Sequence, residues 1–161
     1  MTPTRQQILG PILLGGLIAG TVDIGAACLI NKLSPVVILQ AIASGVLGRA
    51  SFQSGLPAAA LGLVLQWAMS LLIAVIFVSA AQRLAILKQR WIASGLAYGV
   101  VIFLVMNYVV VPLSAAPFSA KFHLIKAIED MLAMLLFGLI IAFFGRRSSA
   151  GAPLLTDQLL E

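Results

Sequence analysis

Apolar residues form long charge-free runs along the chain, and these runs predict helices that can cross a membrane. The two longest are Ala50–Gln82 and Trp91–Ala120. A helix needs about 20 mostly apolar residues to cross about 30 Å of hydrocarbon. The period-two alternation of a transmembrane strand is missing from these runs. The pattern therefore predicts four membrane-spanning helices, at about residues 8–30, 57–80, 91–113 and 122–144.

A shorter apolar segment, Pro35–Gly48, lies between the first two predicted spans. It is too short to cross the hydrocarbon, so we expect a re-entrant or interfacial helix, followed by an irregular segment, Arg49–Leu56. If the helix does cross, the chain has five spans and its C-terminus changes sides. The predicted fold is an all-α, polytopic membrane four-helix bundle with this extra short helix. It forms a single transmembrane domain over residues 1–147, followed by a flexible cytoplasmic tail at residues 148–161.

The composition agrees with a membrane protein and excludes other classes. Of the 161 residues, 61% are hydrophobic and 9% are charged, whereas an average soluble domain is about 45–50% apolar and about 25% charged. This rules out an ordinary soluble domain, a disordered chain and a disulfide scaffold. We attribute the net charge of +5 to topology and lipid contact, because a nucleic-acid-binding protein needs a clustered basic face with aromatic residues. The expected partner is the lipid bilayer, not a nucleic acid.

Basic residues are more numerous on one side of the four-span arrangement. The N-terminal tail, the central loop and the C-terminal end carry Arg5, Arg83, Lys88, Arg90, Arg146 and Arg147. The opposite side carries Lys32, Arg49, Lys121 and Lys126. Cytoplasmic loops are enriched in Lys and Arg. Both termini are therefore predicted to be cytoplasmic.

Four polar side chains fall inside the predicted spans, one in each: Asp23, Gln66, Asn107 and Asp130. Each lies about 4–8 Å from the middle of its span. Because alternate spans run in opposite directions, all four offsets fall in the same half of the bilayer. An ionised carboxylate that faces lipid costs several kcal/mol, so both acids are expected to face the bundle interior. The sequence therefore predicts one buried polar layer.

Glycines share the helix faces of this layer. Gly16 and Gly20 lie on one stripe with Asp23 and form a small-xxx-small pattern, which lets a second helix approach closely. Gly62 lies on the same face as Gln66. We predict that these three glycines are helix-packing positions.

Two interpretations of the polar layer remain open. In the first, the layer is a structural clamp whose interhelical hydrogen bonds, worth about 0.6–2 kcal/mol each, set the helix register. In the second, it is a site for a proton, an ion or a small solute, because intramembrane acids mark such sites. Arg49, Lys126 and Glu129 are secondary candidates for the same site.

The sequence lacks the signatures of catalysis and of cofactor binding. His123 is the single histidine, which excludes a site with several histidine ligands for a metal. Glu129 and Asp130 are adjacent and so point about 100° apart on a helix. No phosphate-binding loop is found. We expect no enzymatic activity, no cofactor and no metal site.

Three stretches carry a resemblance to a known group of proteins: Gly16–Asp23, Ile42–Arg49 and Tyr98–Ser114. Together they resemble the YagU-like group of small bacterial inner-membrane proteins, which have four predicted spans and no known function. The resemblance implies a bacterial origin and residence in the inner membrane. Members of the group often place a histidine in the second span, where this chain has Gln66. This departure weakens any metal or proton-relay role carried over from the group.

The sequence favours a non-enzymatic inner-membrane protein whose helices pack around the polar layer, acting as a homo-oligomer or as a partner of another membrane protein. The alternative is a small transporter or channel-like protein that moves protons, ions or a small solute through a site containing Asp23 and Asp130. A water-accessible cavity that reaches Asp23 would favour the alternative, whereas a dry and fully paired layer would favour the clamp.

Overall fold

The chain folds as an all-helical bundle, as predicted. The computed structural model describes residues 5–117 and 124–148, and this part of the chain contains helices and no strand. The four long helical segments are α1 (Arg5–Asn31), α3 (Gly55–Arg83), α5 (Trp91–Val105) with its continuation, and α7 (Leu124–Gly145). The shorter elements are α2 (Pro35–Leu47), η1 (Gly48–Phe52), α4 (Ala85–Gln89), η2 (Met106–Val110) and α6 (Val111–Leu113).

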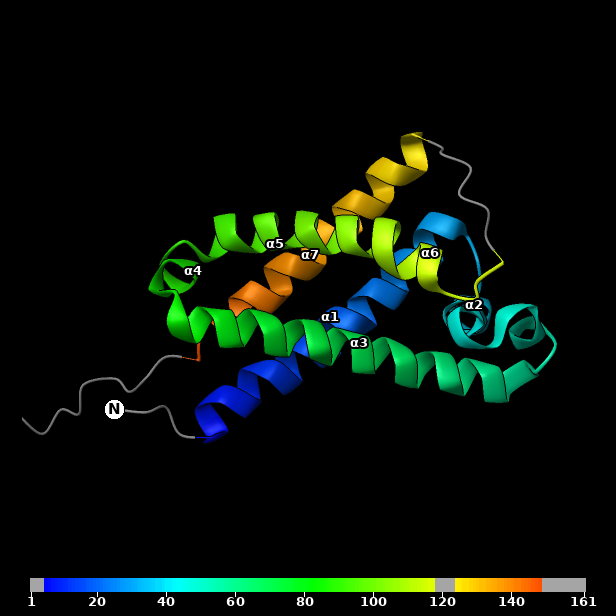
Figure 1. Ribbon diagram of the computed structural model, residues 1–161, viewed down its shortest axis with the longest axis horizontal. Coiled ribbons are helices and arrows are strands. Elements are labelled where there is room, and N and C mark those ends of the chain that lie inside the picture. The colour runs from blue at the N-terminus through cyan, green and yellow to red at the C-terminus, as the bar shows by residue number, and fades with distance from the viewer. Residues whose placement is uncertain (1–4, 118–123, 149–161) are drawn as a thin grey trace, which may run out of the picture.

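The long helices cross in two layers. In Figure 1, α3 and α5 lie in front and run nearly parallel in the view, while α1 and α7 cross behind them. α7 packs between α1 and α5, and α3 packs on α1. One end of the bundle holds the start of α1, the end of α3, the start of α5 and the end of α7 (Figure 1). We call this end the α4 end, because α4 connects α3 to α5 there.

Close packing depends on small residues at the helix contacts. Gly16 lies against Leu71 of α3, so that a Cβ at Gly16 would come within 2.9 Å of that side chain. Gly20 lies against Ser70 of α3 in the same way. Both glycines therefore lie where α1 and α3 approach each other most closely, at the spacing predicted to allow it.

Glycines also bring α5 and α7 together, a contact that the sequence interpretation did not identify. A Cβ at Gly95 would lie 2.9 Å from the Cβ of Ala142, and one at Gly99 would lie 2.8 Å from the Cα of Leu135. Gly138 of α7 faces the backbone of both α5 glycines. The Gly95-xxx-Gly99 spacing is the signal that could have predicted this contact.

The short segment α2–η1 packs on the opposite end of the bundle from α4. The Gln40 side-chain amide donates to the carbonyl of Gly55, 3.0 Å away, and the amide of Ala115 donates to the carbonyl of Gly45, 2.9 Å away. Gly62 faces the backbone of Leu39, so this predicted packing glycine contacts α2. These contacts join α2 to the start of α3 and to the chain after α6.

The prediction of an irregular segment after α2 is wrong in part. Gly48, at φ 59°, ends α2 and leads into the 3-10 helix η1. A turn follows, and α3 begins at Gly55, also at φ 59°. Ser51 is fully buried inside this compact turn, and its hydroxyl donates to the carbonyl of Gly48 at 3.0 Å. The local i to i+3 bonds outweigh the turn-forming tendency of the Ser and Gly residues.

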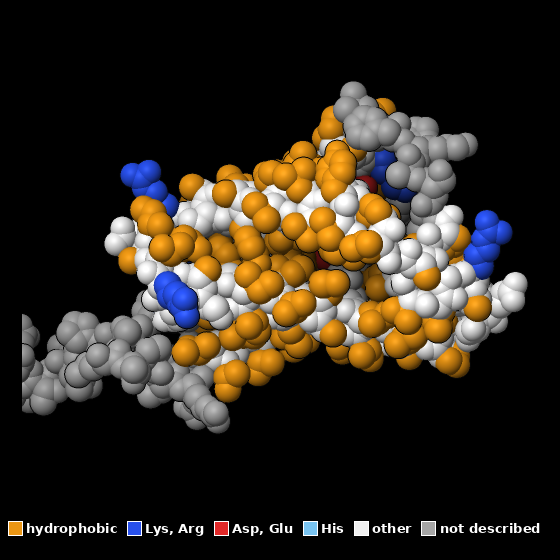
Figure 2. All heavy atoms as spheres, in the orientation of Figure 1, with side chains coloured by type: hydrophobic (Ala, Val, Ile, Leu, Met, Phe, Trp, Pro, Cys, Tyr) orange, Lys and Arg blue, Asp and Glu red, His pale blue; other side chains and the backbone are white. Residues whose placement is uncertain are grey.

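The surface of the bundle is that of a membrane protein. Five helical stretches are long and apolar enough to cross a membrane: Ile8–Asn31, Pro35–Phe52, Gly55–Arg83, Trp91–Leu113 and Ile125–Gly145. The second of them is the predicted short helix extended by η1. The predicted segment was too short to cross the hydrocarbon, but with this extension it is long and apolar enough to do so. Figure 2 shows hydrophobic side chains over the bodies of the helices and Lys and Arg side chains toward their ends. Many large apolar side chains are exposed, as expected where lipid is the solvent.

The end of α7 is held by a polar cluster, so Ser148 belongs to the bundle and not to the predicted tail. Ser148 is buried, and its hydroxyl donates to the carbonyl of Gly145 at 2.8 Å. The Gln82 amide donates to the Ser148 hydroxyl at 2.8 Å, and the Lys88 ammonium donates to the Ser148 carbonyl at 3.1 Å. Residues 149–161 of the predicted tail, together with Lys121 and His123, lie outside the described residues.

Candidate functional site

The structure joins two members of the predicted polar layer by a direct hydrogen bond. The side-chain amide of Gln66 on α3 donates to the Asp23 carboxylate on α1, with 2.7 Å between Nε2 and Oδ2. The two residues are 43 positions apart in the sequence. Both side chains are half-buried. A charge-assisted bond of this length fixes the rotation of α1 relative to α3.

The close approach of α1 and α3 makes this bond possible. Gly20 precedes Asp23 by one turn, and its missing side chain leaves room for Ser70, which follows Gln66 by one turn. The Ser70 hydroxyl donates back to the carbonyl of Gln66 at 2.8 Å and so brings no unpaired polar group to the contact. Trp67 adds a second polar contact, because its indole N–H donates to the Thr21 hydroxyl at 3.3 Å.

On its other side, Asp23 faces a cavity of about 180 Å³. The cavity lies between α1, the third long helix and α7, and its polar lining residues are Asp23, Asn107 and Asp130. Three of the four residues predicted to form one layer therefore line one space, and the fourth, Gln66, is bonded to its wall. The cavity has room for a few water molecules and for polar contacts to hold them.

The cavity wall formed by the third long helix is irregular. Between α5 and α6, the segment η2 makes a π turn in which the amide of Val111 bonds to the carbonyl of Met106, five residues back. Pro112 follows directly; it lacks an amide hydrogen, and its ring would clash with a carbonyl in a regular α-helix. The wider π turn accommodates the proline. Such turns are frequent at functional sites.

Asn107 lies in the π turn, where it is an exposed residue that also contributes to the cavity lining. The Asn107 amide donates to the carbonyl of Phe103 at 2.9 Å, and Phe103 and Met106 also line the cavity. The side-chain oxygen of Asn107 accepts in none of the hydrogen bonds found among the described residues. Asn107 therefore offers an acceptor near the two carboxyl groups.

The charge of the cavity lining has one sign. Among the described residues that line it, two are acids and none is basic. Two carboxyl groups that share a small space favour the binding of a cation or a proton, since like charges repel at short range. This arrangement suits a positively charged occupant more than an anion.

The secondary candidates are not among the residues that line the cavity. Lys126 and Glu129 are exposed on α7, and the charges of both act on Asp130, which does line it. Arg49 is exposed on η1. Within the described ranges, no group of three or more His, Cys, Asp and Glu side chains is placed to hold a metal ion.

Comparisons with known proteins add no relative: no family model, curated protein or solved structure gives a significant match to the chain.

Proposed function

We propose that this protein is a small membrane transport protein that passes a cation, the proton included, through the cavity between α1, η2 and α7. The supporting observation is that Asp23, Asn107 and Asp130 line one cavity with no basic residue among its described lining residues. Intramembrane acids are costly unless they are paired or serve ion movement. This proposal adopts the alternative from the sequence, because a cavity reaches Asp23.

The second candidate function is the non-enzymatic scaffold, and the Gln66–Asp23 hydrogen bond favours it. In that case the layer is a clamp, and the protein acts as a homo-oligomer or as a subunit beside another membrane protein. The clamp alone, however, accounts only for Asp23 and Gln66. It leaves Asp130 and Asn107 on the cavity wall without a role.

We place the protein in a bacterial inner membrane with both termini in the cytoplasm. The resemblance to YagU-like proteins supports the assignment to a bacterial inner membrane. The larger number of basic residues at the α4 end supports the orientation. In this arrangement α2–η1 lies at the non-cytoplasmic end as an interfacial or re-entrant element, and four helices span the bilayer.

The proposal is tested by cation flux into liposomes that contain the purified protein. An internal pH dye reports protons, and dyes for Na⁺ and K⁺ report the other cations. Wild-type protein is expected to accelerate the flux of at least one of these ions, and Asp23→Asn is expected to lower this flux strongly, to a residual rate that is still measurable above that of protein-free liposomes. Gln89→Leu is the control, because Gln89 is an exposed polar residue of α4 outside the cavity lining. Equal rates for wild-type and protein-free liposomes with all three ions would reject the proposal.

A further inference from the structure

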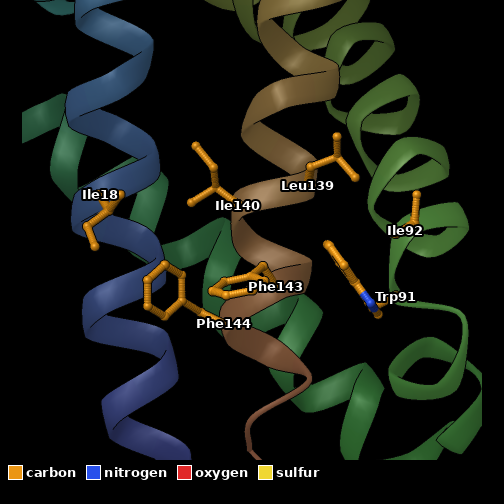
Figure 3. A pocket seen from close by; sticks show the side chains of 7 residues that line it. All are labelled: Ile18, Trp91, Ile92, Leu139, Ile140, Phe143 and Phe144. Carbon is orange, nitrogen blue, oxygen red and sulfur yellow. The ribbon is translucent and has the colours of Figure 1, made fainter.

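A second cavity lies on a different side of α7 and is entirely apolar. It is a groove of about 390 Å³. Its floor is α7 and its walls are α1 and α5, as Figure 3 shows. The principal lining residues are Ile18, Trp91, Ile92, Leu139, Ile140 and Phe143. Trp91 is the first residue of α5, and Phe143 lies two residues before the end of α7, so the groove opens at the α4 end of the bundle.

Two arginines lie at this opening on an aromatic cluster. The guanidinium of Arg146 is 4.5 Å from the centre of the Trp91 ring and 4.6 Å from that of Phe143. The guanidinium of Arg147 is 4.5 Å from the Phe143 ring on which Arg146 also stacks. Trp91 and Phe143 meet edge to face, with 5.7 Å between their ring centres. The rings thus hold two positive charges beside the opening of the groove.

The backbone that carries these arginines is anchored. Ser148, directly after Arg147, is buried and bonded to Gln82 and Lys88 at the α3–α4 junction. Arg146 and Arg147 are thereby held close to the groove on a fixed turn. Arginine binds phosphate with two parallel hydrogen bonds, so paired arginines on a fixed turn suit a phosphate group.

We propose that this groove binds an anionic phospholipid, with an acyl chain along α7 and the phosphate at Arg146 and Arg147. The apolar lining matches the chain, and the two guanidinium groups match the charge of the headgroup. Basic pockets between membrane helices bind anionic headgroups in this way. The proposal does not depend on cation transport, because none of the groove residues lines the acidic cavity.

A second copy of the chain is a poorer occupant. Copies inserted in the same direction meet with their α4 ends at the same level of the membrane. A symmetric contact through the groove would then bring the arginines of both copies together, and like charges at an interface are unfavourable.

Quenching of tryptophan fluorescence by brominated lipids tests the proposal. The chain has two tryptophans, and Trp67→Phe leaves Trp91, which lines the groove, as the only tryptophan, which is excited selectively over the tyrosines at long wavelength. The protein is placed in phosphatidylcholine vesicles that contain a small fraction of either brominated phosphatidylglycerol or brominated phosphatidylcholine. The anionic lipid is expected to quench Trp91 with about tenfold higher apparent affinity. The double variant Arg146→Gln/Arg147→Gln is expected to abolish this preference.

Arg83→Gln is the matched control, because Arg83 is an exposed basic residue at the same end of the bundle. It is expected to keep the preference, which would exclude a general effect of surface charge. Equal quenching by the two lipids would overturn the proposal. The proposal would also be overturned if neither lipid quenched Trp91 and copies of the chain could be cross-linked to each other. If Trp67→Phe fails to fold, native mass spectrometry of the wild type measures retained phosphatidylglycerol against phosphatidylcholine, with the same arginine variants and the same criteria.

Discussion

At the scale of single residues, the bond between Gln66 and Asp23 joins α1 to α3 inside the bundle. Gln66→Leu removes the donor and leaves the carboxylate without its partner. We predict a loss of about 1–2 kcal/mol in the free energy of unfolding, measured by titration with a denaturing detergent in mixed micelles. Gln89→Leu is the control, since Gln89 is exposed on α4. Equal stability of the two variants would contradict a role of the bond in holding the helices.

The helix contact next to this bond gives a second residue-scale prediction. Gly20→Val places a branched side chain against Ser70 and Trp67, and overpacking of this kind costs about 1–3 kcal/mol. A Cβ at Gly25, in the same helix, would meet no atom within 4 Å, so Gly25→Val is the matched control. The same mixed-micelle titration should therefore show a large loss for the first variant and little change for the second. A similar loss in both would mean that helix propensity, and not packing, decides the effect.

At the scale of elements, Asn107 lies in the π turn η2, and Pro112 follows this turn at a place where a proline ring is unfavourable in a regular α-helix. Pro112→Ala restores an amide hydrogen and allows a regular α-helix through Leu113. We predict that the variant is at least as stable as the wild type, but that its cation flux falls because Asn107 turns away from the cavity. Pro57→Ala is the control, because Pro57 lies in the first turn of α3, where proline is tolerated. Unchanged flux in Pro112→Ala would show that the π turn is dispensable.

The elements also show what could be predicted from the sequence. The third helical stretch has the predicted bounds, Trp91–Leu113. Its start coincides with the start of the charge-free run after Arg90, whereas its end lies inside that run, before Ser114. The π turn within it was missed, since hydropathy does not report hydrogen-bond register. Pro112 near the end of the run was the available signal. The side of α1 on which Asp23 lies was predictable, because Gly16 and Gly20 are on the same face of α1 and that face packs against α3.

At the scale of the whole molecule, the proposed topology rests on the numbers of basic residues at the two ends of the bundle. Gln53 and Gln89 are exposed at opposite ends of the bundle. With Cys28, the single cysteine, replaced by alanine, we predict that Gln53→Cys reacts with an impermeant thiol reagent only from the non-cytoplasmic side. Gln89→Cys should react only from the cytoplasmic side. The reverse pattern in right-side-out and inside-out vesicles would contradict this orientation of α3 and therefore the proposed topology.

The joint arrangement of the helices was not predictable from the sequence. Depth arguments placed Asp23, Asn107 and Asp130 at one level, but they do not report which helices are neighbours. The cavity depends on α7 lying between α1 and α5, and that order follows from the Gly95, Gly99 and Gly138 contact. Long-range packing of this kind is encoded in shape complementarity between helices, which a linear pattern of polar and apolar residues does not contain.

The central claim is that Asp23 and Asp130 form one cation site, and a double-mutant comparison of flux in liposomes tests it most directly. Residues that act as one unit give strongly non-additive losses. Because both side chains line the same cavity, Asp23→Asn and Asp130→Asn should each lower the flux strongly, and the double variant should be no slower than the slower single variant. Flux that survives Asp130→Asn unchanged, or losses that multiply in the double variant, would contradict a shared site.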